Sequence, residues 1–86
     1  MFIFQGRTTN GASAVTQDSN FINSVFCWGV FAGATVILQG STDNIEWFDL
    51  ATFTAKGVIG VGVKCPYKRG FVSGATGTTN INLDIQ

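Results

Sequence analysis

The chain has 86 residues, with five basic and five acidic side chains, no histidine and a formal net charge of zero. This length is enough for one domain with a thin core, because a chain this short buries only about 60 to 65 % of its unfolded surface when it folds alone. A chain without net charge has no field to attract a polyanion or an anionic membrane, so we expect neither nucleic acid nor a membrane as a partner. Charged residues make up only 12 % of the chain, and such an uncharged surface favours a protein that lives in an assembly.

The N-terminal segment predicts a short strand followed by a polar arm. Residues 2–4 are apolar and extended, and Gly6 ends the strand. Residues 7–20 are rich in Thr, Asn, Ser, Gly and Gln, which predicts a long loop or arm, extended in part over residues 12–17. A polar segment of this length in a small domain is usually functional or ordered by a partner. The arm's candidate contact residues are Thr8, Ala14 and Val15.

Residues 21–31 form the longest predicted strand, and it is apolar on both faces. One face carries Val25, Cys27 and Phe31. The other face carries Ile22, Phe26, Trp28 and Val30. One face can line the core of the domain, whereas the other needs a second cover, so we interpret Phe26 and Trp28 as candidate residues of a partner interface.

Residues 34–50 predict a β-hairpin, because an alternating strand is followed by a polar turn and a second extended segment. Asp43 and Asn44 suit the turn, since their short side chains bond nearby backbone amides and tolerate positive φ. In a regular strand, one of the neighbouring residues Trp47 and Phe48 must point away from the core. Both are therefore candidate interface residues.

The remaining sequence predicts three more strands. In residues 57–63 glycine alternates with larger apolar residues, which permits close approach of another backbone at the glycine face. Pro66 separates this segment from a strand over residues 67–73, and residues 80–85 alternate as a half-buried strand. No helix is indicated anywhere. Residues 1–86 therefore predict a single all-β domain, a small antiparallel β-sandwich or jelly-roll-like barrel of about seven strands.

A pattern in the second half of the chain resembles a known class of protein. Its matching positions are Gly40, Ser41, Asp43, Trp47, Phe53, Thr54, Ala55, Gly57 and residues 74–79. Together they cover residues 34–85 and resemble small all-β virion proteins encoded among the structural genes of tailed bacteriophages. The resemblance implies a non-enzymatic head decoration or cement protein that binds the lattice of the major capsid protein. Such a protein would be made in the host cytoplasm and reside in the virion, and we expect a homo-oligomer, with a trimer favoured.

Two alternatives to a head protein stay open. The first is a tail or neck component of the same particle. The second is a carbohydrate-binding β-sandwich module, in which exposed aromatic side chains stack on sugar rings. The aromatic candidates for such a module are Trp28, Trp47, Phe48 and Tyr67. A structural role predicts aromatic side chains buried between chains, whereas glycan binding predicts a row of exposed ones.

No catalytic residue is predicted, because the chain lacks the histidine that usually activates a serine or cysteine nucleophile. Cys65 lies near Lys64 and Lys68, whose charges would favour a thiolate, but no base accompanies it. We expect Cys27 and Cys65 to be buried thiols and not a disulfide.

We also expect no metal and no cofactor. Asp43, Glu46 and Asp49 lie close in sequence and suggest a calcium site. However, Asp43 belongs to the predicted turn, and Glu46 and Asp49 fall on opposite faces of an extended segment. These carboxylates therefore do not converge by themselves.

Overall fold

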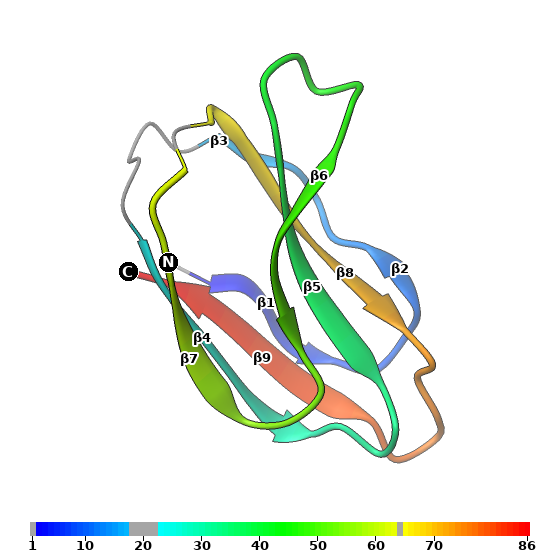
Figure 1. Cartoon of the computed structure of the whole chain (residues 1–86). Coiled ribbons are helices and arrows are strands. Elements are labelled where there is room, and N and C mark those ends of the chain that lie inside the picture. The colour runs from blue at the N-terminus through cyan, green and yellow to red at the C-terminus, as the bar shows by residue number, and fades with distance from the viewer. Residues whose placement is uncertain (1, 18–22, 64) are drawn as a thin grey trace.

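A computed structural model describes residues 2–17, 23–63 and 65–86, which form two packed antiparallel sheets (Figure 1). Sheet A has the strand order β1 (Phe2–Arg7), β9 (Asn80–Ile85), β4 (Asn23–Val30) and β7 (Gly57–Val61). In sheet B, β8 (Tyr67–Ser73) pairs with β5 (Thr35–Ser41), which pairs with β6 (Phe48–Phe53). The short strands β2 (Gly11–Ala12) and β3 (Thr16–Gln17) pair with the other edge of β8. This β-sandwich confirms the predicted fold class.

The core lies between the two sheets because the strands alternate apolar residues inward with other residues outward. In β9 the alternation is regular, with Ile81, Leu83 and Ile85 buried. Opposite them, β5 contributes Val36 and Leu38, which are fully buried. The rest of the buried cluster is Ile3, Val25, Cys27, Ala34, Ala51, Phe53, Val61, Val72 and, near the strand ends, Cys65.

The segment predicted as a polar loop or arm pairs with sheet B where the structure describes it. The backbone N–H of Ser13 donates to the carbonyl of Gly70 at 2.8 Å, and the N–H of Gly70 donates to Ser13 Oγ at 2.9 Å. Farther along, the N–H of Ala75 donates to Asn10 Oδ1 at 2.7 Å. The side chains of Asn10 and Ser13 thus bond β8 and the turn that follows it, whereas Arg7 bonds backbone carbonyls within the segment itself. Residues 18–20 of the predicted arm lie outside the described residues.

Strand β4 is two-faced, as predicted from its sequence. Val25 and Cys27 are buried, whereas Phe26 and Trp28 are exposed on the opposite face. The strand is closely packed at Gly29, where φ is 125° and a Cβ atom would overlap the carbonyl oxygen of Asn80. Phe21 and Ile22, predicted as part of this strand, lie outside the described residues.

The predicted hairpin is present, but its turn lies later in the sequence than expected. Strand β5 continues through Ser41, and β6 begins only at Phe48. Asp43 Oδ1 accepts from the backbone N–H groups of Ile45 and Glu46, both at 2.9 Å. These two bonds close a turn from the predicted Asp43 to Glu46, and the extended backbone resumes only at Phe48. Alternation in the sequence predicts the hairpin. It does not predict which backbone N–H groups bond the side chain in the turn, and these bonds set where the turn ends.

Candidate partner-binding face

The outer face of sheet A is the largest group of exposed apolar side chains among the described residues. It comprises Phe2, Phe26, Trp28, Val30 and Val58. These residues point outward because their neighbours in each strand, such as Ile3, Val25 and Cys27, point into the core. Exposed apolar residues that are scattered need no explanation, but a contiguous set on one face marks an interaction site.

Strand register brings the members of this face together from distant parts of the sequence. Phe26 on β4 is paired with Val58 on β7 and, on its other side, with Asp84 on β9. Asp84 is in turn paired with Phe2 on β1. The rings of Phe2 and Trp28 lie 5.8 Å apart at an interplanar angle of 56°, a tilted contact that is favourable for aromatic pairs. The face is therefore continuous across all four strands of sheet A.

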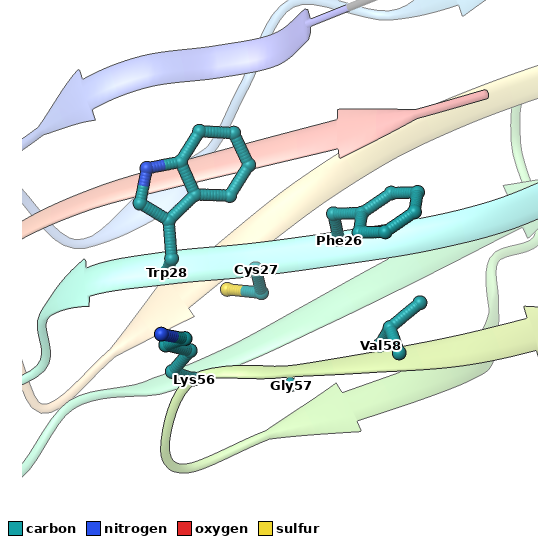
Figure 2. A pocket seen from close by; sticks show the side chains of 6 residues that line it. All are labelled: Phe26, Cys27, Trp28, Lys56, Gly57 and Val58. Carbon is teal, nitrogen blue, oxygen red and sulfur yellow. The ribbon is translucent and has the colours of Figure 1, made fainter.

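A groove crosses this face between β4 and β7 (Figure 2). Trp28 and Lys56 border one side, and Phe26 and Val58 border the other, around the paired residues Cys27 and Gly57. Its volume is about 310 Å³. Cys27 and Gly57 themselves face the core, since Cys27 is buried and a Cβ atom on Gly57 would lie 3.8 Å from the ring of Phe53. An apolar side chain fits this shape, with the Lys56 ammonium available to a polar group beside it.

A carboxylate lies within the apolar face. Asp84 is half-buried between Phe2 and Phe26, and its Oδ2 accepts from Gln86 Nε2 at 2.6 Å. Burial acts to raise the pKa of Asp84, but hydrogen bonds, including the one from Gln86, outweigh it and hold the pKa below its ordinary value. Asp84 therefore contributes a carboxylate group to the outer face of sheet A at neutral pH, and Lys56 contributes an ammonium group at the edge of the groove.

A second set of predicted site residues lies at the hairpin, on sheet B. The guanidinium of Arg69 lies 4.2 Å from the centre of the Trp47 ring, within the range of a cation–π interaction. Arg69 Nε donates to Gln39 Oε1 at 2.8 Å, and Gln39 Nε2 donates to Asp49 Oδ1 at 3.0 Å. One side of the Trp47 ring is thus already occupied by a side chain of its own sheet.

Phe48 is the most exposed of the predicted aromatic site residues, at 63 %. It lines a small cavity of about 100 Å³ together with Leu50, Val63 and the buried Cys65. Ile45, in the adjacent turn, is also exposed. The hairpin end therefore offers a second, smaller apolar surface, separate from the outer face of sheet A.

The structure does not bring the predicted site residues together into one site. Phe26 and Trp28 lie on the outer face of sheet A, and Trp47 and Phe48 lie at the hairpin of sheet B. The arm residues lie exposed along the segment that pairs with β8; they are Thr8, Ala14 and Val15.

Sequence reasoning missed Phe2 and Val58 as members of the site. Val30 was predicted to lie on the outward face of its strand together with Phe26 and Trp28, and the structure places it there. Phe2 and Val58 join the face only through strand pairing, and strand order cannot be deduced from residues that alternate within single strands. The run of glycine and valine in β7 was the available signal, because it indicated a strand face open to approach.

The reactive groups are held in structural positions. Cys27 and Cys65 are both free and buried, and burial raises the pKa of the Cys27 thiol to about 12. Lys68 is fully buried, and its Nζ donates to the carbonyl oxygen of Cys65 at 3.3 Å. Lys64, the other predicted neighbour of Cys65, lies outside the described residues. Over residues 2–17, 23–63 and 65–86, no three His, Cys, Asp or Glu side chains are grouped to hold a metal ion.

Comparison of the chain with protein-family models, with curated proteins and with solved structures finds no match. In the part of the chain that the structure describes, no helix is long and apolar enough to cross a membrane.

Proposed function

We propose that this chain is a non-enzymatic structural subunit of a tailed-phage virion, a head decoration or cement protein that binds the lattice of the major capsid protein. The capsid assignment follows from the sequence resemblance over residues 34–85. The mode of binding follows from the outer face of sheet A, where Phe2, Phe26, Trp28 and Val58 form an open apolar surface. Burying such a surface against a neighbouring protein is favourable by about 25 cal/mol per Å² of apolar area.

The outer face of sheet A is the structural observation that supports this mode of binding. It is a rigid surface, because strands on both sides hydrogen-bond the central strands β9 and β4. A rigid apolar surface binds without the entropic cost of ordering a loop. The groove beside Trp28 accepts an anchoring side chain from the capsid, which is how a few residues dominate the affinity of an interface.

The proposal is tested on particles purified by density gradient from cells that carry this gene. Mass spectrometry should find the chain in the particle band, in fixed ratio to the major capsid protein. A double variant, Phe26→Thr with Val58→Thr, should leave the particle band, whereas Thr52→Ala, an exposed position on sheet B, should remain bound. A chain that never sediments with particles would overturn the proposal.

The same experiment locates the contact. Phe48→Thr removes an exposed aromatic side chain at the hairpin without touching sheet A. Loss of binding by this variant alone would move the interface to the hairpin. A tail or neck location is distinguished by labelling: antibody against the chain should decorate heads, and decoration confined to tails or necks would place it in that part of the virion.

Glycan binding is the second candidate, and the groove is the observation that favours it. Trp28 and Phe26 expose ring surface beside Lys56, an arrangement able to stack on a sugar and bond one of its polar groups (Figure 2). Trp47 is a weaker platform, because Arg69 covers one side of its ring. A glycan array tests this function, with Trp28→Ala as the variant. A specific signal that disappears in Trp28→Ala, with folding retained, would rank glycan binding above capsid binding.

A further inference from the structure

Strand β7 is an unprotected edge of sheet A. It is the last strand of the sheet and pairs only with β4 among the described strands. Its five residues, GVIGV, include no charged residue and no proline, and its register with β4 is continuous without a bulge. Charges, prolines and bulges are the devices by which proteins prevent edge strands from pairing with other chains. An edge without them is a template for strand addition.

The sequence of β7 is complementary to itself in antiparallel pairing. A two-fold axis through Ile59 pairs residue 57 with residue 61 of a second copy and residue 58 with residue 60. All five strand residues then find a partner, and each glycine lies opposite a valine, with Ile59 opposite itself at the axis. Moving the axis by one residue in either direction leaves one end of the strand unpaired. A register that pairs residue 58 of one copy with residue 59 of the other is also excluded. Directly paired residues must have their side chains on the same face of the joined sheet, and residues 58 and 59 lie on different faces.

The space at the glycines fits this pairing. Val58 is 58 % exposed on the outer face of sheet A, and a Cβ atom placed on Gly60 of the same face would have nothing within 4 Å. In the two-fold pair, the valine side chain of one copy fills the open position beside the glycine of the other. Isologous contacts of this kind, in which residue i meets residue j and j meets i, are the usual basis of two-fold dimers.

We propose that two copies of this chain associate through antiparallel pairing of their β7 strands, centred on Ile59. Sheet A then becomes one continuous sheet of eight strands, four from each copy. The two outer faces, with Phe26 and Trp28 of each copy, lie on the same side of the joined sheet, since a two-fold axis perpendicular to a sheet preserves its faces. This dimer does not depend on the virion role, although it would present a capsid with two binding faces at once.

The test is the mass of the chain in solution, measured by sedimentation equilibrium. The wild type should sediment as a dimer of the 9.1 kDa chain at micromolar concentration. Gly60→Glu adds a charged side chain that the isolated fold accommodates, because the position is open, but that collides with Val58 of the second copy. This variant should sediment as a single chain. Gly77→Glu, at an equally open glycine in the turn before β9, is the matched control and should remain dimeric.

Cross-linking tests the register. Val58→Cys and Gly60→Cys place thiols on residues that are directly opposite each other in the two-fold pair, where paired Cβ atoms lie about 4.5 to 5.5 Å apart. A short bifunctional thiol reagent should join the two variants when they are mixed, and should join either one to itself much less. The native thiols do not interfere, because both are buried.

Three other results of the sedimentation experiment would contradict the two-fold pairing of the β7 strands. A wild type that stays a single chain, a wild-type trimer, or a Gly60→Glu variant that stays dimeric would each contradict it, and a trimer would favour the oligomer expected from sequence. These results are separate from the virion test. If the chain is a monomer that still binds particles, the dimer is contradicted and the proposed function stands. If the chain is a dimer that never binds particles, the dimer stands and the proposed function is contradicted.

Discussion

The ring of Phe4 on β1 occupies the space that a side chain at Gly70 on β8 would need. A Cβ atom at Gly70 would overlap the Phe4 ring, and it would lie 3.0 Å from a methyl group of Leu83. Gly70 is buried, and its backbone also bonds Ser13. This contact joins sheet A to sheet B directly, because the ring fills the position where β8 has no side chain.

Gly70→Ala should therefore destabilise the fold, although alanine normally suits a strand better than glycine does. Overpacking of a filled core costs about 1 to 3 kcal/mol, and we expect the upper part of that range. Chemical denaturation followed by circular dichroism measures the loss. Gly77→Ala, where the added methyl group meets open space, should change the free energy of unfolding by less than about 0.5 kcal/mol. Equal stability of the two variants would show that Phe4 moves aside freely.

The contact between Phe4 and Gly70 also shows what the sequence could not predict. Alternation indicates strands β4, β5, β8 and β9 and their buried faces, since burial in a sheet has a period of two residues. It contains no information about which strand of one sheet crosses which strand of the other. The position of Phe4 over Gly70 depends on that crossing. The presence of Phe2 and Val58 on one face depends instead on the strand order within sheet A, which alternation within single strands does not reveal either.

The pairing of the arm with β8 could not be predicted, for a related reason. Residues 7–17 have few apolar side chains, and a polar segment is normally read as a loop. Two-residue strands such as β2 and β3 are held by backbone and polar side-chain bonds to β8, and these leave no hydrophobic period in the sequence. The sequence predicted extended structure over part of residues 12–17, and the structure has the two short strands at Gly11–Ala12 and Thr16–Gln17.

Acid should weaken the hairpin turn through Asp43. The backbone N–H groups of Glu46 and Ile45 donate to its carboxylate and hold the pKa of Asp43 below its ordinary value. A lowered pKa in the folded state means that the turn is stabilised above the pKa of the unfolded chain, about 3.9. That stabilisation is lost as the pH falls through the lower pKa of the folded state.

The check is the free energy of unfolding of the wild type and of Asp43→Asn at pH 7 and at several values below pH 4. The variant keeps an acceptor oxygen in the turn but does not titrate, so its disadvantage should shrink as the pH falls. Asp43→Ala removes the acceptor and should be weaker than the wild type at both ends of the range. A constant difference between the wild type and Asp43→Asn at all pH values would contradict the assignment.

The two thiols should be silent in the native protein and reactive after unfolding. Burial raises the pKa of Cys27 to about 12, so almost none of it is thiolate at pH 8, and Cys65 is buried beside Gly40, where an added Cβ atom would lie 2.5 Å from its sulfur. Titration with a chromogenic thiol reagent should count no fast-reacting thiol in the folded protein. In denaturant without reductant it should count two. A count of zero after unfolding would reveal a disulfide formed in solution.

Ser13 should hold the arm to sheet B. Its hydroxyl oxygen accepts from the buried N–H of Gly70 at 2.9 Å and donates to the carbonyl of Ala14 at 3.0 Å. Ser13→Ala leaves the Gly70 N–H without this acceptor, and a buried donor without a partner costs about 1 to 3 kcal/mol. We expect a loss of stability in that range and faster hydrogen exchange at the Gly70 amide, whereas Thr9→Ala, at an exposed position of the same segment, should leave both unchanged. If Ser13→Ala keeps both its stability and its slow exchange at Gly70, then the main-chain bond from Ser13 to Gly70 and the short strands β2 and β3 are enough to fix the arm.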